Sequence, residues 1–257
     1  MRFALVNNDK TEASPRQKGL CAVCANPVTA KCGKQRIWHW AHDAKMVCDR
    51  WWETETEWHR AWKNHFPREC QESVLHDEQS GEKHIADVRT SLGLVIEFQH
   101  SHLDPQERDS RERVYGNMVW VVDGTRLKRD YPRFQNGKRD FRSAQLRGFY
   151  RVFFPDECFP AAWVNSKVPV VFDFRGVASD EPPDATREAL WCLLPGRTDR
   201  FALVAAISRD QFVEHTRNQA HLFPQPAPAP APPALPVAQG IPNGLFFRPV
   251  RRRKFRF

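Results

Sequence analysis

The sequence lacks the long apolar segments of membrane and secreted proteins. Its 257 residues contain no run of about eighteen apolar residues, the length that a membrane-spanning helix needs. The opening MRFALVNNDK turns polar after Val6, so it does not form the basic and then apolar leader of a secreted protein. Seven cysteines, an odd number, argue against a framework of disulfides. We therefore expect a cytoplasmic protein without a membrane span.

The composition predicts a folded protein with an anionic partner. Hydrophobic residues make up 41% and aromatic residues 12%, enough for one substantial core and a smaller module. The net charge of +8 favours a polyanion such as nucleic acid, although much of the excess lies near the C-terminus. DNA is the partner that we expect.

Four of the seven cysteines lie in the first 50 residues, which we expect to form a separate module (1–50). A CxxC pair is followed after fourteen residues by the run HWAH, and two thiolates with two imidazoles can complete a structural Zn²⁺ shell. The predicted ligands are Cys21, Cys24, His39 and His42. Because HxxH is tighter than the usual zinc-finger ending, Cys32 or Cys48 could replace one histidine. The alternative is a reduced CxxC turn beside two packed histidines.

Residues 85–99, IADVRTSLGLVIEFQ, predict a hairpin that carries two acids. If Ser91–Gly93 is a three-residue loop, Asp87 lies opposite Glu97. Glu97 and Gln99 then point to one face, because residues two apart on a strand do so. Two converging carboxylates can hold Mg²⁺ or Mn²⁺, which could polarise a phosphate and activate water. The alternative is an amphipathic hairpin with a merely solvated polar face.

The pattern from 51 to 126 predicts the order α-β-β-β-α-β. Trp58, Trp62 and Phe66 have helical spacing, and Asp104 followed by Pro105 opens a second helix. MVWVVDG predicts the last strand of this unit. This order, with the acids on the second and third strands, resembles the core of the PD-(D/E)xK nuclease superfamily.

A narrower resemblance is to the competence protein CoiA family. It rests on CxxC, HWAH, ETEWHRAWK, GEKHIADV, VIEFQHS and RERVYGNMVWVVDG in this order, over residues 1 to about 126. The resemblance implies a metal-dependent deoxyribonuclease of natural transformation and recombination, with recombination or DNA-uptake proteins as possible partners. It places Asp87 and Glu97 at the acidic metal ligands, Gln99 where the superfamily usually has lysine, and Glu57 at the first-helix glutamate.

Gln99 is a departure from the superfamily, because a neutral amide cannot offer positive charge to a developing oxyanion. Lys63 or Lys83 could supply that charge. Glu57 has an alternative role, since Thr54 and Glu57 have the spacing of a capping box.

Several basic segments could contact nucleic acid. His59 and Lys63 on the first helix and Arg111 and Arg113 on the second are candidates, the alternative being an exposed basic face. The polar, basic stretch 127–147 predicts a loop whose aromatic side chains, Tyr131, Phe134 and Phe141, could stack on bases.

The C-terminal half predicts strands around 168–174, 190–196 and 201–208 and a short helix near 209–217, which either extend the sheet or form a subdomain. A Pro/Ala linker follows at 224–236 and leads to a basic tail. The tail residues that we expect to bind DNA are Arg251, Arg252, Arg253 and Lys254.

The predicted fold is α/β (α+β), a restriction-endonuclease-like mixed sheet with a small N-terminal zinc module and a C-terminal β-rich extension. Four segments are expected: the zinc module (1–50), the nuclease-like core (51–126), the extension (127–222), and the linker with the tail (223–257). The predicted function is hydrolysis of DNA phosphodiester bonds by a metal-dependent nuclease. The alternatives are a catalytically weak or inactive DNA-binding accessory protein and, less consistent with the paired acids, a structural adaptor.

Overall fold

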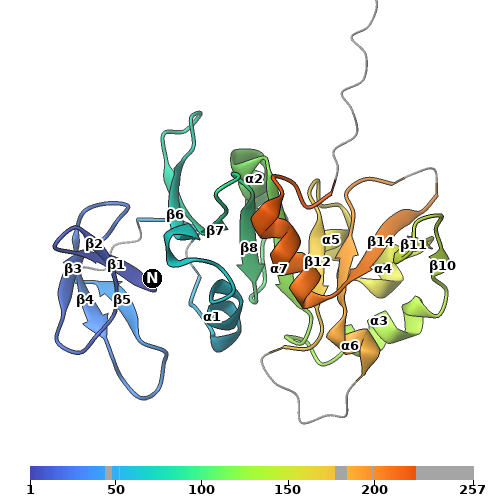
Figure 1. Cartoon of the computed structure of the whole chain (residues 1–257), viewed down its shortest axis with the longest axis horizontal. Helices are drawn as coiled ribbons and strands as arrows, with labels where there is room; N and C mark the ends of the chain where they lie inside the picture. Colours follow the sequence, from blue (N-terminus) through green and yellow to red (C-terminus); the bar gives the residue numbers. More distant parts are fainter. Residues whose placement is uncertain (44–47, 52, 177–183, 198–199, 224–257) are drawn as a thin grey trace, which may run out of the picture. The chain divides into compact units, whose positions relative to one another are not determined.

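The structure is a computed structural model that describes residues 1–43, 48–51, 53–176, 184–197 and 200–223 (Figure 1). Met1–Pro224 form one compact unit. The predicted Pro/Ala linker and the four basic tail residues, Arg251 to Lys254, lie outside the described residues. No helix in the described ranges is long and apolar enough to cross a membrane.

The N-terminal module is a five-stranded antiparallel sheet in the order β2-β1-β3-β4-β5. Its strands are β1 (Phe3–Val6), β2 (Asp9–Glu12), β3 (Lys18–Leu20), β4 (Pro27–Lys31) and β5 (His39–His42). Asn7 and Asn8 join β1 to β2 with φ of 53° and 68°, a left-handed conformation that asparagine tolerates better than most residues. Val28 and Trp40 are buried in its small core.

The predicted α-β-β-β-α-β order is present between residues 57 and 123. It consists of α1 (Glu57–Lys63), β6 (Gln71–His76), β7 (Lys83–Arg89), β8 (Val95–Gln99), α2 (Pro105–Tyr115) and β9 (Met118–Asp123), with a 3₁₀ turn, η1 (Arg68–Cys70), before β6. Strands β6, β7 and β8 are antiparallel, and β9 is parallel to β8. As predicted, Asp104 caps α2 by accepting hydrogen bonds from the Gln106 and Glu107 amides.

The hairpin between β7 and β8 has the predicted register. Val88 pairs with Ile96 and Arg89 with Val95, so Asp87 is next in line opposite Glu97. Gly93 has φ of 85° and donates its amide to Thr90 O at 2.9 Å. A side chain at that φ would be strained, so glycine sets the loop length and with it the alignment of the acids.

The C-terminal half continues the same sheet. The nine strands follow the order β10-β11-β14-β13-β12-β9-β8-β7-β6, with β12 parallel to β9. The elements after β9 are α3 (Asp130–Lys138), β10 (Arg142–Ser143), β11 (Phe149–Val152), α4 (Pro155–Cys158), α5 (Ala161–Val164), β12 (Val170–Asp173), α6 (Ala185–Glu188), β13 (Leu190–Leu193), β14 (Ala202–Ile207) and α7 (Arg209–Asn218). The three predicted strands and the helix near 209–217 are therefore confirmed.

The prediction of a nucleic-acid-facing loop at 127–147 is wrong. Most of that stretch forms α3 and the short strand β10. Tyr131 and Phe134 are buried at 7% and 0% exposure, and Phe141 packs against the same core. These rings are therefore not available to stack on bases.

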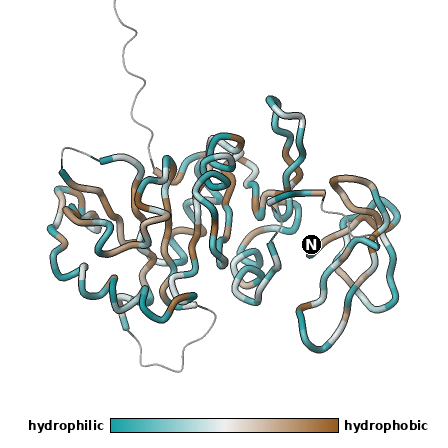
Figure 2. The backbone as a smooth tube through the Cα atoms, turned by 180° about the vertical axis from the view of Figure 1, so that it is seen from behind, coloured by the Kyte–Doolittle hydropathy of each residue, from teal (hydrophilic) through white to brown (hydrophobic). Residues whose placement is uncertain are grey.

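Two apolar clusters cover the two faces of the large sheet. One contains Trp120, Phe134 and Phe172, and the other contains Trp58, Trp62 and Phe98. Figure 2 shows hydrophobic stretches of the backbone in this part of the chain and also in the N-terminal module. Ile96 and Phe98 thus bind β8 to the core through one face, which leaves Glu97 and Gln99 on the other.

Candidate functional site

Four side chains of the N-terminal module lie together in a group that could bind a metal ion, called the metal-binding group below. Ligand atoms of Cys21, Cys24, His42 and Cys48 all lie within 4.8 Å of one another. Cys24 Sγ is 3.3 Å from His42 Nε2, and Cys21 Sγ is 3.7 Å from Cys48 Sγ. Burial raises the pKa of the Cys24 thiol, but hydrogen bonds from Asn26 and His42 outweigh burial and lower that pKa to about 6. Three thiolates and one imidazole are a donor set that Zn²⁺ prefers.

The ligand set corrects one predicted residue. His39 lies outside the group, and its Nδ1 is instead 2.8 Å from Ile37 O. The two histidines are three residues apart on β5, so they point to opposite faces of that strand. His42 shares a face with the buried Trp40. Cys48 takes the fourth position, one of the two substitutions that the sequence left open, and Cys32 does not join the group among the described residues.

Replacing His42 with asparagine should remove zinc, whereas the same change at His39 should not. Only His42 belongs to the metal-binding group, and a module this small depends on its metal for stability. Metal analysis of the purified variants measures the zinc content directly. Cys48→Ser and Cys32→Ser form a second matched pair with the same expected contrast. Full zinc occupancy in His42→Asn would contradict the assignment.

The predicted acids gather in a small cavity of the large sheet. Asp87 from β7 and Glu97 from β8 line a space of about 50 Å³. The chain before α1 adds Glu53 and Glu55, and β6 adds Glu72. The basic side chains in the lining are Lys63 from α1, Arg111 from α2 and His59 from α1.

Lys63 is the central cation of this cavity. Only 4% of it is exposed, and its Nζ lies 2.9 Å from Asp87 Oδ1 and 3.4 Å from Glu72 Oε1 and Glu55 Oε1. Burial opposes the charge, but Asp87, Glu72 and Glu55 together raise the pKa of Lys63. Burial likewise opposes ionisation of Asp87, but Lys63 and His59 lower the pKa of its carboxyl. Lys63 and Asp87 therefore form a buried ion pair.

Glu97 has a different electrostatic environment. Its Oε2 is 3.1 Å from an Arg111 Nη1, and its Oε1 accepts a hydrogen bond from the Asp87 amide at 3.1 Å. Burial and the neighbouring Asp87 charge outweigh Arg111 and raise the pKa of Glu97 to about 8. The two acids across the hairpin thus have pKa values shifted in opposite directions.

This shift predicts how stability depends on pH without a divalent metal in the cavity. Between roughly pH 4.5, the ordinary pKa of glutamate, and pH 8, the folded protein keeps a proton on Glu97 that the unfolded chain has lost. With respect to this group, the free energy of unfolding is highest below pH 4.5 and declines as the pH rises toward 8. Glu97→Gln should flatten this part of the profile. Melting temperatures of both proteins across this range measure it, and identical slopes would contradict the assignment.

Gln99 lies two residues after Glu97 on β8, and its side-chain oxygen accepts no hydrogen bond from the described residues. The side chain is 2% exposed, and its Nε2 donates to Glu53 Oε2 at 2.8 Å. Its Oε1 is buried and has no hydrogen-bond partner among the described residues. A buried carbonyl oxygen without a partner is costly, and a cation or water could satisfy it.

Glu57 does not form the predicted capping box. The cap of α1 is Thr56, which forms a capping box with His59 rather than Thr54 with Glu57. Glu57 does not line the acidic cavity, whereas Glu53 and Glu55 do. The sequence analysis did not single out these two acids. The alternation of glutamate and threonine in ETETE, residues 53–57, is the local signal that could have indicated them.

The predicted nucleic-acid contacts are placed differently by the structure. Arg111, His59 and Lys63 are buried in the cavity rather than on an exposed basic face. Arg113 is exposed, and its guanidinium donates a hydrogen bond to Gln79 Oε1 at 2.6 Å. Lys83 is exposed on β7 and does not line the cavity, so Lys63 is the lysine near the acids.

The cavity has oxygen donors suited to Mg²⁺, but they do not converge on one point. Within the described ranges, the cysteine group is the one set of three or more metal-ligating side chains that meets at a common centre. Asp87 and Glu97 are instead held by Lys63 and Arg111. Mg²⁺ often binds through only one or two carboxylates and keeps several waters. Asp87 and Glu97 are two such carboxylates, whereas Gln99 does not line this cavity and contacts it through Glu53.

Comparison with known proteins gives one match. No curated protein and no solved structure matches the chain. Residues 5–50 match the family model for the N-terminal domain of competence protein CoiA. The match supports the resemblance of the N-terminal module to the CoiA family and stops short of the strands that carry Asp87 and Glu97.

Proposed function

We propose that the protein is a metal-dependent deoxyribonuclease with a role related to competence. The observation that carries this proposal is the convergence of Asp87 and Glu97, from paired strands, on one cavity that also holds Lys63. The α-β-β-β-α-β order, with the acids on its second and third strands, is what the PD-(D/E)xK resemblance implies. The match of residues 5–50 to a competence family supports the biological role.

In this proposal Asp87 and Glu97 would hold Mg²⁺ or Mn²⁺, with Gln99 as a neutral oxygen donor. When bound, the metal supplies Lewis-acid polarisation of the phosphate and an activated water. Glu97 must be ionised to bind it, so a pKa near 8 makes metal affinity rise with pH up to that value.

Lys63 takes the part that lysine has in the wider superfamily. Gln99 cannot carry positive charge, whereas Lys63 lies 2.9 Å from Asp87 within the same cavity. With a metal held by Asp87, the Lys63 ammonium would lie in the cavity to stabilise the charge that develops on the attacked phosphate. Arg111 fixes the position of the Glu97 side chain through its hydrogen bond to Oε2.

One observation favours a second candidate, a DNA-binding protein that does not cut. Asp87 is already paired with Lys63, and Glu97 contacts Arg111 and keeps a proton below about pH 8. If this arrangement persists, the cavity holds no divalent metal and the acids act only as a structural network.

Cleavage of circular DNA separates the two functions. The full chain is incubated with single-stranded and duplex DNA, each as circles and as linear molecules, in Mg²⁺ or Mn²⁺, and the products are separated by electrophoresis. The nuclease produces linear or shortened DNA only when the metal is present. Binding of DNA without any product from circles or linear molecules, in either metal, would support the second candidate.

A further inference from the structure

An exposed tryptophan lies on the loop that joins β4 to β5. Trp38 is 45% exposed, and it is the exposed tryptophan of the described residues, the others being buried or half-buried. Residues 33–36 of the same loop are exposed. Leaving the largest apolar side chain in water is unfavourable, so the position points to a binding partner.

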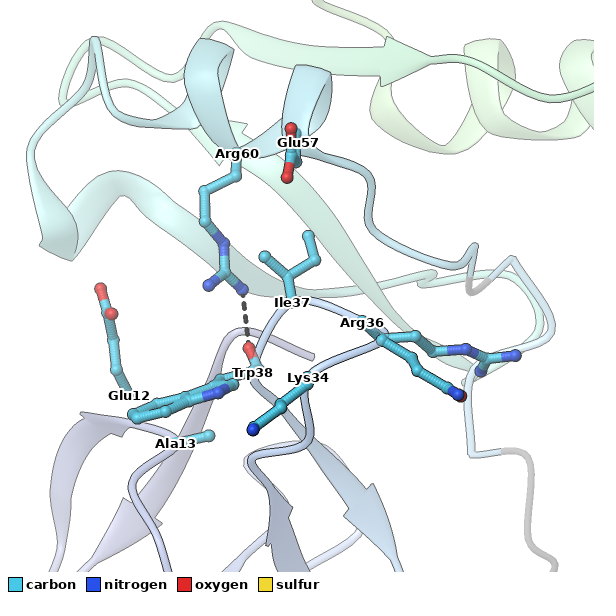
Figure 3. A pocket seen from close by; sticks show the side chains of 9 residues that line it. Glu12, Ala13, Lys34, Arg36, Ile37, Trp38, Glu57 and Arg60 are labelled. Atoms are coloured by element: carbon cyan, nitrogen blue, oxygen red, sulfur yellow. Dashed lines mark hydrogen bonds between the residues drawn. The ribbon is translucent and has the colours of Figure 1, made fainter.

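The loop forms one wall of a cavity of about 380 Å³ beneath α1 (Figure 3). Arg60 reaches from the helix to the loop and donates to Trp38 O at 3.0 Å. This bond fixes the backbone at Trp38 while its ring stays accessible.

The cavity has a surplus of positive charge. Lys34 and Arg36 line it and form no ion pair with any residue that the structure describes. Of the two acids in the lining, Glu12 is paired with Arg2 at 2.7 Å, and Glu57 remains. An aromatic ring beside free cations is the combination that binds single-stranded nucleic acid, with bases stacked on the ring and phosphates near the cations.

The cavity leads toward the acids. A second cavity of about 300 Å³ shares Gln35, Arg36 and Ile37 with it. This second cavity also shares Met1 and Glu55 with the space around Asp87 and Glu97. The second cavity therefore neighbours both the space beside Trp38 and the space around the proposed catalytic acids.

We propose that the loop of residues 33–38 is a subsite for single-stranded DNA, with an unpaired base stacked on Trp38 and the flanking phosphates held by Lys34 and Arg36. The direction of the strand toward Asp87 rests on the proposed nuclease function. Bases in a duplex are already stacked on their neighbours, so the subsite selects unpaired nucleotides.

Binding of a fluorescently labelled oligo(dT) to the full chain tests the proposal, measured by anisotropy in buffer without Mg²⁺ or Mn²⁺. Trp38→Ala should weaken binding about tenfold, because one base no longer stacks on the indole. Trp38→Phe keeps an aromatic face and should retain most of the affinity. The Lys34→Ala/Arg36→Ala double variant should flatten the salt dependence, by roughly 0.7 in the log–log slope for each phosphate that the protein no longer neutralises.

Two matched controls give the contrast. Phe154→Ala removes another exposed aromatic ring, and Lys128→Ala/Arg129→Ala removes another exposed basic pair; neither should change binding. Duplex DNA of the same length should be insensitive to Trp38→Ala. The proposal is overturned if Trp38→Ala binds oligo(dT) as tightly as the wild type, or if Phe154→Ala weakens binding as much. Because no cleavage is measured, a protein that binds in this way but never cuts refutes the nuclease and leaves the subsite intact.

Discussion

Asp87→Asn should reduce metal-dependent DNA cleavage by more than about a hundredfold. The substitution keeps the shape of the side chain and removes one of the two negative charges proposed to hold the metal. Replacing even an outer partner of a metal ligand typically costs about 10- to 100-fold, so a direct ligand should cost more. The fold should persist, because Lys63 retains Glu72 and Glu55 as partners.

Asp104→Asn is the matched control for this experiment. It makes the same chemical change at the exposed cap of α2, where asparagine caps as well as aspartate does. Initial rates of product formation in Mg²⁺ or Mn²⁺ are compared for the three proteins, with melting temperatures as a check on folding. Cleavage by Asp87→Asn at the wild-type rate would remove Asp87 from the site.

Asp173→Ala should lower the free energy of unfolding by about 3–5 kcal/mol, the usual cost of breaking a buried ion pair from one side. Asp173 on β12 has 0% exposure. Its Oδ2 accepts hydrogen bonds at 3.0 Å from the indoles of Trp58 and Trp62, and its Oδ1 accepts one from Arg209 at 2.8 Å. The substitution leaves two indole N–H groups and a guanidinium without their partner.

Asp173→Ala should also disturb the cavity around Asp87 and Glu97, because Trp58 and Trp62 fix α1, the helix that carries Lys63. Denaturant unfolding measures the loss, and Asp140→Ala, at an exposed position after α3, should stay within about 0.5 kcal/mol of the wild type. A loss below about 1 kcal/mol for Asp173→Ala would show that the two tryptophans hold α1 without it.

Local patterns predicted the hairpin and its acids correctly. Alternation of apolar and polar residues gave the two faces of β8, and Gly93 gave the loop length, so the positions of Asp87 and Glu97 needed no long-range information. The cap at Asp104 was equally local. These features depend on residues within a few positions of one another.

Errors arose where a local pattern allowed more than one answer. Thr54 and Thr56 both precede α1, and the helix begins two residues later than the capping pattern at Thr54 required. His39 and His42 looked like a ligand pair until the strand placed them on opposite faces.

The helix α3 was missed because it contains Pro132 and Gly137. Proline is tolerated there because it lies in the first turn, where backbone amides have no partner within the helix. Gly137 is required by packing, since a Cβ at that position would lie 2.3 Å from Cys158 Sγ. Both residues usually indicate a loop in a sequence.

Contacts between distant segments could not be predicted. Glu53 and Glu55 enter the cavity because Gln99 and Lys63 bind them, and Asp173 meets α1 across more than a hundred residues of chain. No spacing in the sequence encodes these pairs, since they follow from the order of strands in the sheet.

Anomalous diffraction from crystals of the protein soaked in Mn²⁺ tests the central claim most directly. We expect an anomalous peak bound by the carboxylates of Asp87 and Glu97, with the Lys63 ammonium displaced from its 2.9 Å contact with Asp87. Zinc, distinguished by its own absorption edge, should appear at Cys21, Cys24, His42 and Cys48. A Mn²⁺-soaked crystal without a peak at the two acids, in which Lys63 keeps its contact with Asp87 and Arg111 its contact with Glu97, would contradict the account.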